Sequence, residues 1–320
     1  MRILFMGTPE FAVISLDALC KSRHEVVAAV SQPDKPKGRG HKLMPPPVKA
    51  YALDFGITVY QPETLKDNAF LATLQELAPE LIVVAAYGKK LPEYVLNYPK
   101  YGCINIHASL LPKYRGAAPI HRCIMNGETN TGVTIMYMAE GIDTGDMLLK
   151  SETKINENET TVQLHDRLAS MGADALIRAI EGIEAGTIER EKQDDSLVCY
   201  ASMINKQTAL IDWSRSATEI NNLVRAMNSW PLAYTYCGGN MMKIASTEVT
   251  KCQVGNAAGT PGQVLGHTTG EGLLVACGVG VIAVKEVQFE GKRLMGIDDY
   301  MKGNTIEPGT ILRQTAAEDR

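Results

Sequence analysis

The stretch VYQPETLKDNAFLATLQELAPELIVVAAY, residues 59–87, reads as a strand, a helix and a second strand in succession. Residues 59–61 open with a β-branched and an aromatic side chain, a composition typical of strands. Residues 68–77 carry apolar side chains at steps of three and four, which is the spacing of an amphipathic helix. Residues 81–87 are a continuous apolar run, as expected for a strand buried on both faces of a parallel sheet. The stretch therefore predicts a β-α-β unit, the building block of an α/β fold.

The same alternation continues on both sides of this stretch through the first half of the chain. The predicted strands are 2–6, 25–30, 59–61, 81–87, 103–107, 132–138 and 146–154, and the predicted helices are 11–21, 48–55, 68–77 and one that begins at Glu159 or Thr160. The last two strands follow one another without a helix between them, so we expect them to finish the sheet as a hairpin-like pair. The whole pattern predicts a doubly wound, Rossmann-like α/β domain with a mostly parallel sheet.

The chain changes character after residue 186. Residues 187–206 are charged and aperiodic and are interpreted as a linker. Ser216 and Glu219 have the spacing of a capping box, which predicts a helix directly after Ser216. Short apolar runs separated by glycines follow, and they predict a small, OB-like β-barrel. We expect its strands at 234–237, 241–249, 262–265, 273–276 and 281–289. The predicted domains are therefore 1–186 and 207–320, joined by the linker.

Composition narrows the class of protein. With 320 residues, 45% hydrophobic and 21% charged, the chain has ordinary globular proportions and no apolar stretch of the length, about 20 residues, that spans a membrane. The N-terminal run Met1–Met6 leads into a glycine turn rather than a secretory signal, so we expect a cytoplasmic protein. The seven cysteines are scattered, with no C-x-x-C pair and no clustered histidines, which predicts free thiols and no metal site. A net charge of −4 leaves any polyanion to be bound by a local basic patch.

A polar pair interrupts the strand expected at 103–107. Asn105 and His107 lie two residues apart, so both side chains point to one face at the carboxyl end of that strand. An Asn amide can donate a hydrogen bond to a developing oxyanion, and a His can transfer a proton or add positive charge. Asp143, in the glycine-flanked loop 141–145, is the candidate third group that would orient the His. This combination suits acyl transfer, and ordinary hydrogen bonding between structural side chains is the alternative.

Two runs around these residues resemble the motifs of one family. NIHASLLPKYRGAAPI at 105–120 and GVTIMYMAEGIDTGDM at 132–147 are similar to segments of the formyltransferases that use 10-formyltetrahydrofolate. The resemblance implies that Asn105, His107 and Asp143 are the catalytic residues. It further implies a folate site, to which it assigns Ser109, Leu110, Leu111 and Pro112. The formyl donor would be 10-formyltetrahydrofolate, bound as a co-substrate, and the resemblance implies no metal.

The segment from Asp34 to Lys49 bears on which branch of the family the chain resembles. The glycinamide ribonucleotide branch ends where the linker begins, whereas branches that act on initiator tRNA, on an aminoarabinose substrate or on formyltetrahydrofolate itself carry a second domain. The segment has five cations against one anion and resembles the insertion with which the tRNA-directed branch engages the acceptor arm. The resemblance thus implies methionyl initiator tRNA as the formyl acceptor, contacted by Lys37, Arg39 and Lys42. A solvated basic loop is the alternative.

The charge composition of the expected second domain gives less support for tRNA binding than that of the basic segment. The resemblance implies that it binds tRNA, yet residues 207–320 contain ten Lys and Arg against eleven Asp and Glu, which departs from the basic composition usual for that role. We expect a monomer that binds the tRNA and the folate donor. Two alternatives remain: a formyltransferase that acts on a nucleotide-sugar amine, and a tRNA-binding protein without catalytic activity.

Overall fold

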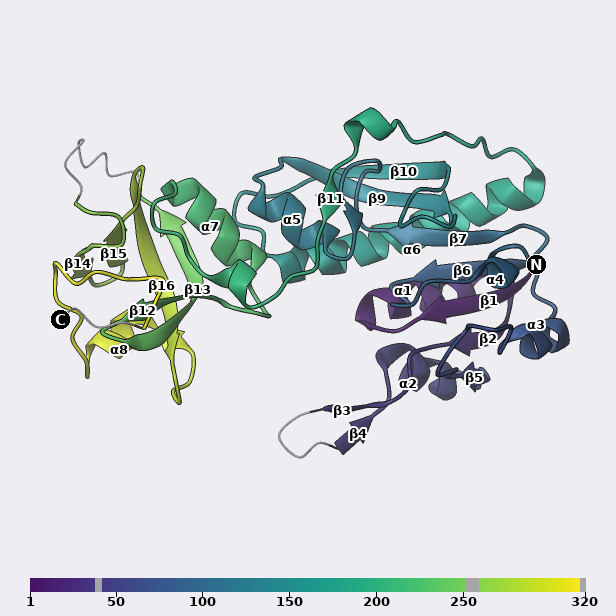
Figure 1. Cartoon of the computed structure of the whole chain (residues 1–320), viewed down its shortest axis with the longest axis horizontal. Helices are drawn as coiled ribbons and strands as arrows, with labels where there is room; N and C mark the ends of the chain where they lie inside the picture. Colours follow the sequence, from purple (N-terminus) through teal and green to yellow (C-terminus); the bar gives the residue numbers. More distant parts are fainter. Residues whose placement is uncertain (38–41, 251–258, 317–320) are drawn as a thin grey trace. The chain divides into compact units, whose positions relative to one another are not determined.

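The structure, a computed structural model, describes residues 1–37, 42–250 and 259–316 (Figure 1). The chain forms two compact units. Unit 1 comprises Met1–Pro119, Asn130–Lys154 and His165–Ala201, and unit 2 comprises Ile120–Thr129, Ile155–Leu164 and the described part of residues 202–320. No helix among the described residues is long and apolar enough to cross a membrane.

Unit 1 is built on a seven-stranded sheet. The strand order is β10 (Met147–Lys154), β9 (Asn130–Tyr137), β7 (Cys103–His107), β6 (Leu81–Ala85), β1 (Arg2–Gly7), β2 (Glu25–Val30) and β5 (Val59–Tyr60). From β7 to β5 every neighbouring pair is parallel, whereas β9 and β10 are antiparallel to their neighbours. The predicted mostly parallel sheet and its terminal hairpin-like pair are confirmed.

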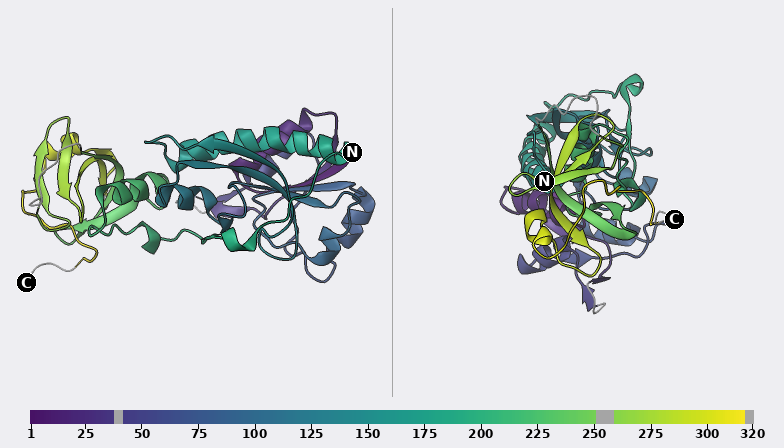
Figure 2. Two further views of the ribbon diagram at one scale, coloured as in Figure 1. Left: turned by 90° about the horizontal axis from the view of Figure 1, so that it is seen from above. Right: turned by 90° about the vertical axis from the view of Figure 1, so that its left-hand side faces the viewer.

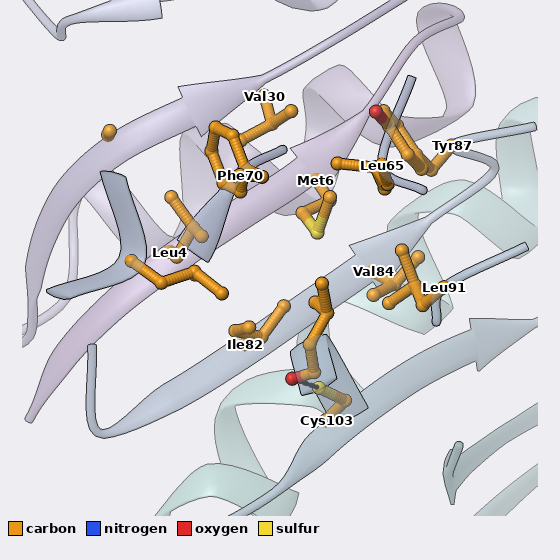
Figure 3. Close-up of a cluster of buried hydrophobic side chains, with 13 residues drawn as sticks. Leu4, Met6, Val30, Leu65, Phe70, Ile82, Val84, Tyr87, Leu91 and Cys103 are labelled. Atoms are coloured by element: carbon orange, nitrogen blue, oxygen red, sulfur yellow. Dashed lines mark hydrogen bonds between the residues drawn. The ribbon is translucent and has the colours of Figure 1, made fainter. Parts of the chain in front are cut away.

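Helices cover both faces of this sheet, as a doubly wound fold requires. The helices of unit 1 are α1 (Glu10–Cys20), α2 (Pro47–Asp54), α3 (Leu71–Leu77), α4 (Glu93–Leu96) and most of α6 (Thr161–Ala185). Alternate residues of β1, β2 and β6 point to one face, where they form a buried cluster with Phe70, Leu74 of α3 and Val95 of α4 (Figure 3). Figure 2 shows α1 and α6 together on one face, where the rings of Phe11 and His165 pack edge to face.

In unit 2, helix α7 (Ala217–Ala226) precedes the sheet, and it starts at the predicted capping box. The side chain of Ser216 accepts a hydrogen bond from the backbone of Glu219, and the Glu219 carboxylate accepts one from the backbone of Ser216. A six-stranded antiparallel sheet follows. Its strands are β12 (Ala233–Cys237), β13 (Asn240–Val249), β14 (Val264–Thr268), β15 (Gly272–Ala276), β16 (Val281–Phe289) and β17 (Met295–Gly296). The remaining α-helices of the described residues are α5 (Pro119–Met125) and α8 (Ile297–Met301), and two short 3-10 helices span Asp195–Leu197 and Gln207–Ala209.

The ends of the unit 2 sheet are joined by the carboxyl-terminal segment. Tyr236 of β12 bridges Arg313, and Gln263, beside β14, bridges Ile311. The main path runs β12-β13-β16-β15-β14, so both of its end strands pair with the same stretch of chain. A sheet whose two edges meet in this way is the barrel that the glycine-separated apolar runs predict.

Two segments expected to be loop or linker are paired with other strands. In the basic segment, β3 (Lys35–Lys37) and β4 (Lys42–Met44) form an antiparallel ribbon. In the charged segment after residue 186, Glu191 exchanges two backbone hydrogen bonds with Met147, and β11 (Tyr200–Ala201) pairs in parallel with β8 (Arg115–Gly116). In both cases the backbone makes the pairing, so the polar composition that suggested loops gives no sign of it.

Candidate active site

Asn105 and His107 lie at the carboxyl end of β7, between β6 and β9. The sheet register places Asn105 beside Val84 of β6 and Met136 of β9. Asn105 is half-buried, and within the part of the chain that the structure describes its side-chain amide has no hydrogen-bond partner. The amide is therefore free to donate to a ligand, as an oxyanion donor must be.

The His107 ring is held between two acceptors. The residue is 5% exposed, and its Nε2 lies 2.9 Å from the backbone oxygen of Tyr114. Because a carbonyl oxygen can only accept, Nε2 must carry the proton of this hydrogen bond. Nδ1 faces Oδ2 of Asp143 at 3.6 Å. In the neutral ring Nδ1 is thus the nitrogen with a lone pair, and a proton taken up there would face a carboxylate.

Asp143 is fixed by its backbone and by a neighbouring amide. Its φ of 51° lies in the left-handed region, where Asp is one of the few residues tolerated. Its Oδ2 accepts a 2.8 Å hydrogen bond from the backbone N–H of Gly116. The site is assembled from β7, from the 114–116 segment and from the loop after β9, so the structure brings Asp143 beside His107 from 36 positions along the chain.

Gln193 and Arg115 form a further layer that sequence analysis did not single out. The Gln193 amide nitrogen donates to the backbone oxygens of Asp143 and Gly145, each at 2.8 Å. Its oxygen accepts from Nε of Arg115 at 2.9 Å, and Nη2 of Arg115 donates to Asp195 at 2.9 Å. Because Gln193 touches the loop only through carbonyl oxygens, no side-chain pattern in the sequence indicates the contact.

The segment assigned to folate by resemblance, Ser109 to Pro112, is a tightly bonded turn after β7. The Ser109 hydroxyl donates to the backbone oxygen of Lys113 at 2.6 Å, and Thr134 bonds both Ser109 and Leu111 through its hydroxyl. Leu111 is 2% exposed and packs against two methionines of the sheet. Ser109 is buried as well, whereas Leu110 and Pro112 are half-buried. Of the four side chains, only those of Leu110 and Pro112 present appreciable surface to a ligand.

A cavity of about 780 Å³ lies in the same unit, within the size range of small-molecule sites. Its apolar lining includes Leu65, Leu91 and Met138, which also belong to or pack against the buried cluster of Figure 3. Lys89 holds one wall in place, since its Nζ donates to the backbone oxygens of Pro62 and Glu63 at 2.8 and 2.7 Å. The lining ends at Glu140, three residues before Asp143.

The segment to which the resemblance assigns the folate site does not line this cavity. The lining contains the 138–140 approach to Asp143 and the 89–93 turn, and none of residues 109–112 is among the described residues that line it. Tyr87, just before that turn, is 1% exposed within the cluster, and burial raises the pKa of its hydroxyl to about 12. The phenol therefore stays a neutral hydrogen-bond donor near neutral pH.

The described residues contain no group of three or more His, Cys, Asp or Glu side chains arranged to hold a metal ion.

The basic segment, Asp34 to Lys49, lies far along the chain from Asn105, His107 and Asp143, the candidate catalytic trio. Lys37 ends β3 and Lys42 begins β4, while Arg39 lies outside the described residues. Lys49 is not a free cation, because its Nζ bonds both carboxylate oxygens of Asp34, at 2.9 and 2.8 Å, and the Gln61 side chain at 2.7 Å.

Comparison with known proteins identifies the class that the fold and this site define. A family model described as formyl transferase matches residues 1–180, and a second, described as formyl transferase, C-terminal domain, matches residues 203–305. The chain belongs to the formyl transferase family. Over 314 residues it is 50% identical to the methionyl-tRNA formyltransferase of Acetivibrio thermocellus, which covers 98% of this chain and 100% of that one. The methionyl-tRNA formyltransferase of Geotalea uraniireducens is also 50% identical, over 98% of each chain.

Solved structures share the fold at lower sequence identity. A sugar 3N-formyl transferase, WlaRD, crystallised with dTDP and 5-N-formyl-THF, aligns with a TM-score of 0.66 at 21% identity, over 92% of this chain and 99% of that one. HypX from Aquifex aeolicus in complex with tetrahydrofolic acid aligns with a TM-score of 0.61 at 16% identity; the alignment covers 94% of this chain and 47% of HypX. These likenesses support the architecture described above.

Proposed function

We propose that this protein transfers the formyl group of 10-formyltetrahydrofolate to the α-amino group of methionine on initiator tRNA, and so supplies formylmethionyl-tRNA for translation initiation. The observation that carries the proposal is the identity of half of the residues, over nearly the full length of both chains, to proteins named methionyl-tRNA formyltransferase. The arrangement suits this chemistry, because the His107 ring bonds the Tyr114 carbonyl and faces the Asp143 carboxylate at 3.6 Å, and the Asn105 side-chain amide has no hydrogen-bond partner among the described residues.

In the proposed mechanism, the neutral amine attacks the formyl carbon and a C–N bond forms. The carbonyl oxygen becomes an oxyanion, which the Asn105 amide stabilises by donating a hydrogen bond. His107 Nδ1, the ring nitrogen with a free lone pair, takes the proton from the attacking nitrogen directly or through water. The resulting imidazolium lies between the Tyr114 carbonyl and the Asp143 carboxylate, so both of its N–H groups face an acceptor. The folate nitrogen then leaves with the electron pair of the broken C–N bond and receives the proton.

The folate donor is proposed to bind in the 780 Å³ cavity, with the pterin on the apolar surface of Leu65, Leu91 and Met138. This position leads toward Asp143, because the lining ends at Glu140 in the same loop. Of the segment Ser109–Pro112, Leu110 and Pro112 retain surface for direct contact, and Ser109 and Leu111 act by holding the turn.

The acceptor tRNA is proposed to contact the basic segment through Lys37, Arg39 and Lys42. Positive charge concentrated in one short segment of sequence suits phosphate contacts, which depend on salt rather than on sequence. We further propose that residues 207–320 form a tRNA-binding domain, that residues 1–186 form the catalytic domain with 187–206 as the connection, and that the enzyme acts as a cytoplasmic monomer.

The test is a formyl-transfer assay with 10-formyltetrahydrofolate and three acceptors: methionyl initiator tRNA, methionyl elongator tRNA and amino-sugar nucleotides. We expect transfer to the initiator tRNA at a kcat/KM far above that for the other acceptors. Preference for an amino-sugar nucleotide would replace the proposed acceptor while leaving the formyl chemistry in place. Binding of tRNA without any transfer to any acceptor would indicate a non-catalytic binding protein.

A further inference from the structure

One side chain from the charged segment after residue 186 joins the two loops that position Asp143. Both amide protons of Gln193 are used, one by the backbone oxygen of Asp143 and one by that of Gly145. The amide oxygen is used by Nε of Arg115. All three contacts are 2.8 or 2.9 Å long, so one side-chain amide is bonded through its oxygen and both of its N–H groups.

These contacts act on the part of the chain that sets the direction of the Asp143 carboxylate. Asp143 has a left-handed backbone conformation, which costs free energy unless neighbouring contacts hold it. Gly145 lies so close to Tyr137 that an added Cβ would be 1.8 Å from the Tyr137 oxygen, which fixes one end of the turn. Gln193 bonds the carbonyl at that end and the carbonyl of Asp143 itself, so it prevents the turn from opening between them.

Arg115 gives the amide its orientation. An arginine can only donate, so the Gln193 atom facing Nε must be the oxygen, and the amide nitrogen must face the two carbonyls. Arg115 is 4% exposed, and the residue after it, Gly116, donates the backbone hydrogen bond to the Asp143 carboxylate. Gln193 therefore links the segment that bonds the carboxylate to the loop that carries it.

We propose that Gln193 is a positioning residue for formyl transfer, which acts through Asp143 by holding its loop at the distance and angle that His107 requires. The inference rests on the proposed function in one respect, since it takes Asp143 to be a catalytic residue. It assigns to the charged segment after residue 186 a role in turnover that is separate from joining the two units.

The test uses two substitutions of Gln193 in the full-length enzyme. Gln193→Ala removes all three hydrogen bonds. Gln193→Glu keeps the shape and the contact with Arg115, but a carboxylate cannot donate to the carbonyls of Asp143 and Gly145 and repels them. We expect both to lower kcat by about tenfold or more, because small displacements of a catalytic group are costly, with KM for folate and for tRNA nearly unchanged. Lys192→Ala, a change at the exposed neighbouring residue, is the matched control and should leave kcat unchanged.

A double-mutant comparison separates positioning through Asp143 from a general structural role. In an Asp143→Ala background, measured under single-turnover conditions, the Gln193 substitutions should change the rate by no more than about twofold, because the group they position is gone. Melting temperatures of all variants identify any loss of folding, and Gln193→Glu tests the proposal if Gln193→Ala is unstable.

Three results distinguish the outcomes. Wild-type kcat in both Gln193 variants would overturn the positioning role while leaving the proposed function intact. A loss of the same size with and without Asp143 would also overturn it, because Gln193 would then act elsewhere. If Asp143→Ala itself turns over at the wild-type rate, the proposed catalytic trio fails, and the inference fails with it.

Discussion

Asn105 and His107 at the end of β7, with Asp143 in the loop after β9, form a candidate catalytic trio in the same unit as the basic ribbon β3–β4, but the two regions are built in opposite ways. His107 and Asp143 are mostly buried, and their polar atoms are held by two backbone groups of the segment 114–116, the Tyr114 carbonyl and the Gly116 N–H. The ribbon has two short strands with exposed Leu43 and Met44 side chains, and the ion pair between Lys49 of α2 and Asp34 lies outside both strands. Group transfer needs fixed geometry, whereas attraction to phosphates needs only charge of the right sign. The two regions should therefore respond differently to substitution and to salt.

The largest effect is expected at the trio. Asn105→Ala, His107→Ala or Asp143→Ala should each lower kcat by about a hundredfold or more, because each removes an oxyanion donor or a group that handles the proton. Steady-state formyl transfer, with tRNA binding measured separately, checks this. Affinity for tRNA and the melting temperature should stay nearly unchanged.

The three residues should also act as a unit. A double substitution within the trio should lose much less than the product of the two single losses, because the groups serve one step. Near-normal turnover in all three single variants would show that the active site lies elsewhere. The losses should not depend on salt, which separates them from every effect expected at the ribbon.

Local periodicity was enough to predict most of the fold. The strands of the seven-stranded sheet of unit 1, its terminal antiparallel pair and the capping box of α7 follow from patterns of a few neighbouring residues, and they are confirmed. The shared face of Asn105 and His107 follows from strand geometry alone. That Asp143 lies close to His107 could be expected only from its glycine-flanked loop and from the family resemblance. The catalytic role of Asn105, His107 and Asp143 stays a prediction.

Contacts made by backbone atoms, or between distant side chains, could not be predicted in this way. Gln193 binds carbonyl oxygens 48 and 50 positions away, and carbonyls are the same in every residue type. Lys49 counted as one of five cations in the basic segment, but its position beside Asp34 and Gln61 depends on how α2 and β5 place these side chains. Composition counts charges without showing which of them are already paired.

The next largest effect is expected at Arg39. A guanidinium that forms a direct, bidentate contact is worth about 1–3 kcal/mol, so Arg39→Ala should weaken use of methionyl-tRNA by that amount in kcat/KM. Titration of the rate against tRNA and against folate checks this, and KM for folate should not change. Equal weakening for both substrates would place the ribbon over the folate cavity and favour an amino-sugar acceptor.

A smaller effect is expected at Lys42. Lys42→Ala should weaken tRNA binding a few fold and lower the slope of log affinity against log salt by about one, as expected for a single phosphate contact. Binding isotherms at several salt concentrations check the slope. Lys154→Ala, which removes an exposed cation at the end of β10, is the control and should leave the slope unchanged. A Lys42 variant with the wild-type slope would remove this residue from the tRNA contact.

The smallest effect is expected at Lys49, which lies in α2 at the end of the basic segment and, like His107 and Asp143, is held by hydrogen bonds and an ion pair. Its ammonium is bonded to Asp34 and Gln61 and is 23% exposed, so it is already neutralised by an internal carboxylate. Lys49→Ala should therefore leave the salt slope and KM for tRNA unchanged and lower the melting temperature by about 2 °C or less.

The dependence of the melting temperature on pH gives a second test of the Lys49–Asp34 pair. The hydrogen bonds from Lys49 and Gln61 lower the pKa of Asp34 below its ordinary value of 3.8. Because the folded-state pKa is the lower one, the stability from this carboxylate is complete above the ordinary value and is lost as the pH falls through the lowered one. The difference in melting temperature between wild type and Lys49→Ala should thus be constant from about pH 6 to pH 8 and shrink only in acid. A reduced salt slope in Lys49→Ala would instead mean that tRNA binding releases Lys49 from Asp34 and recruits it to a phosphate.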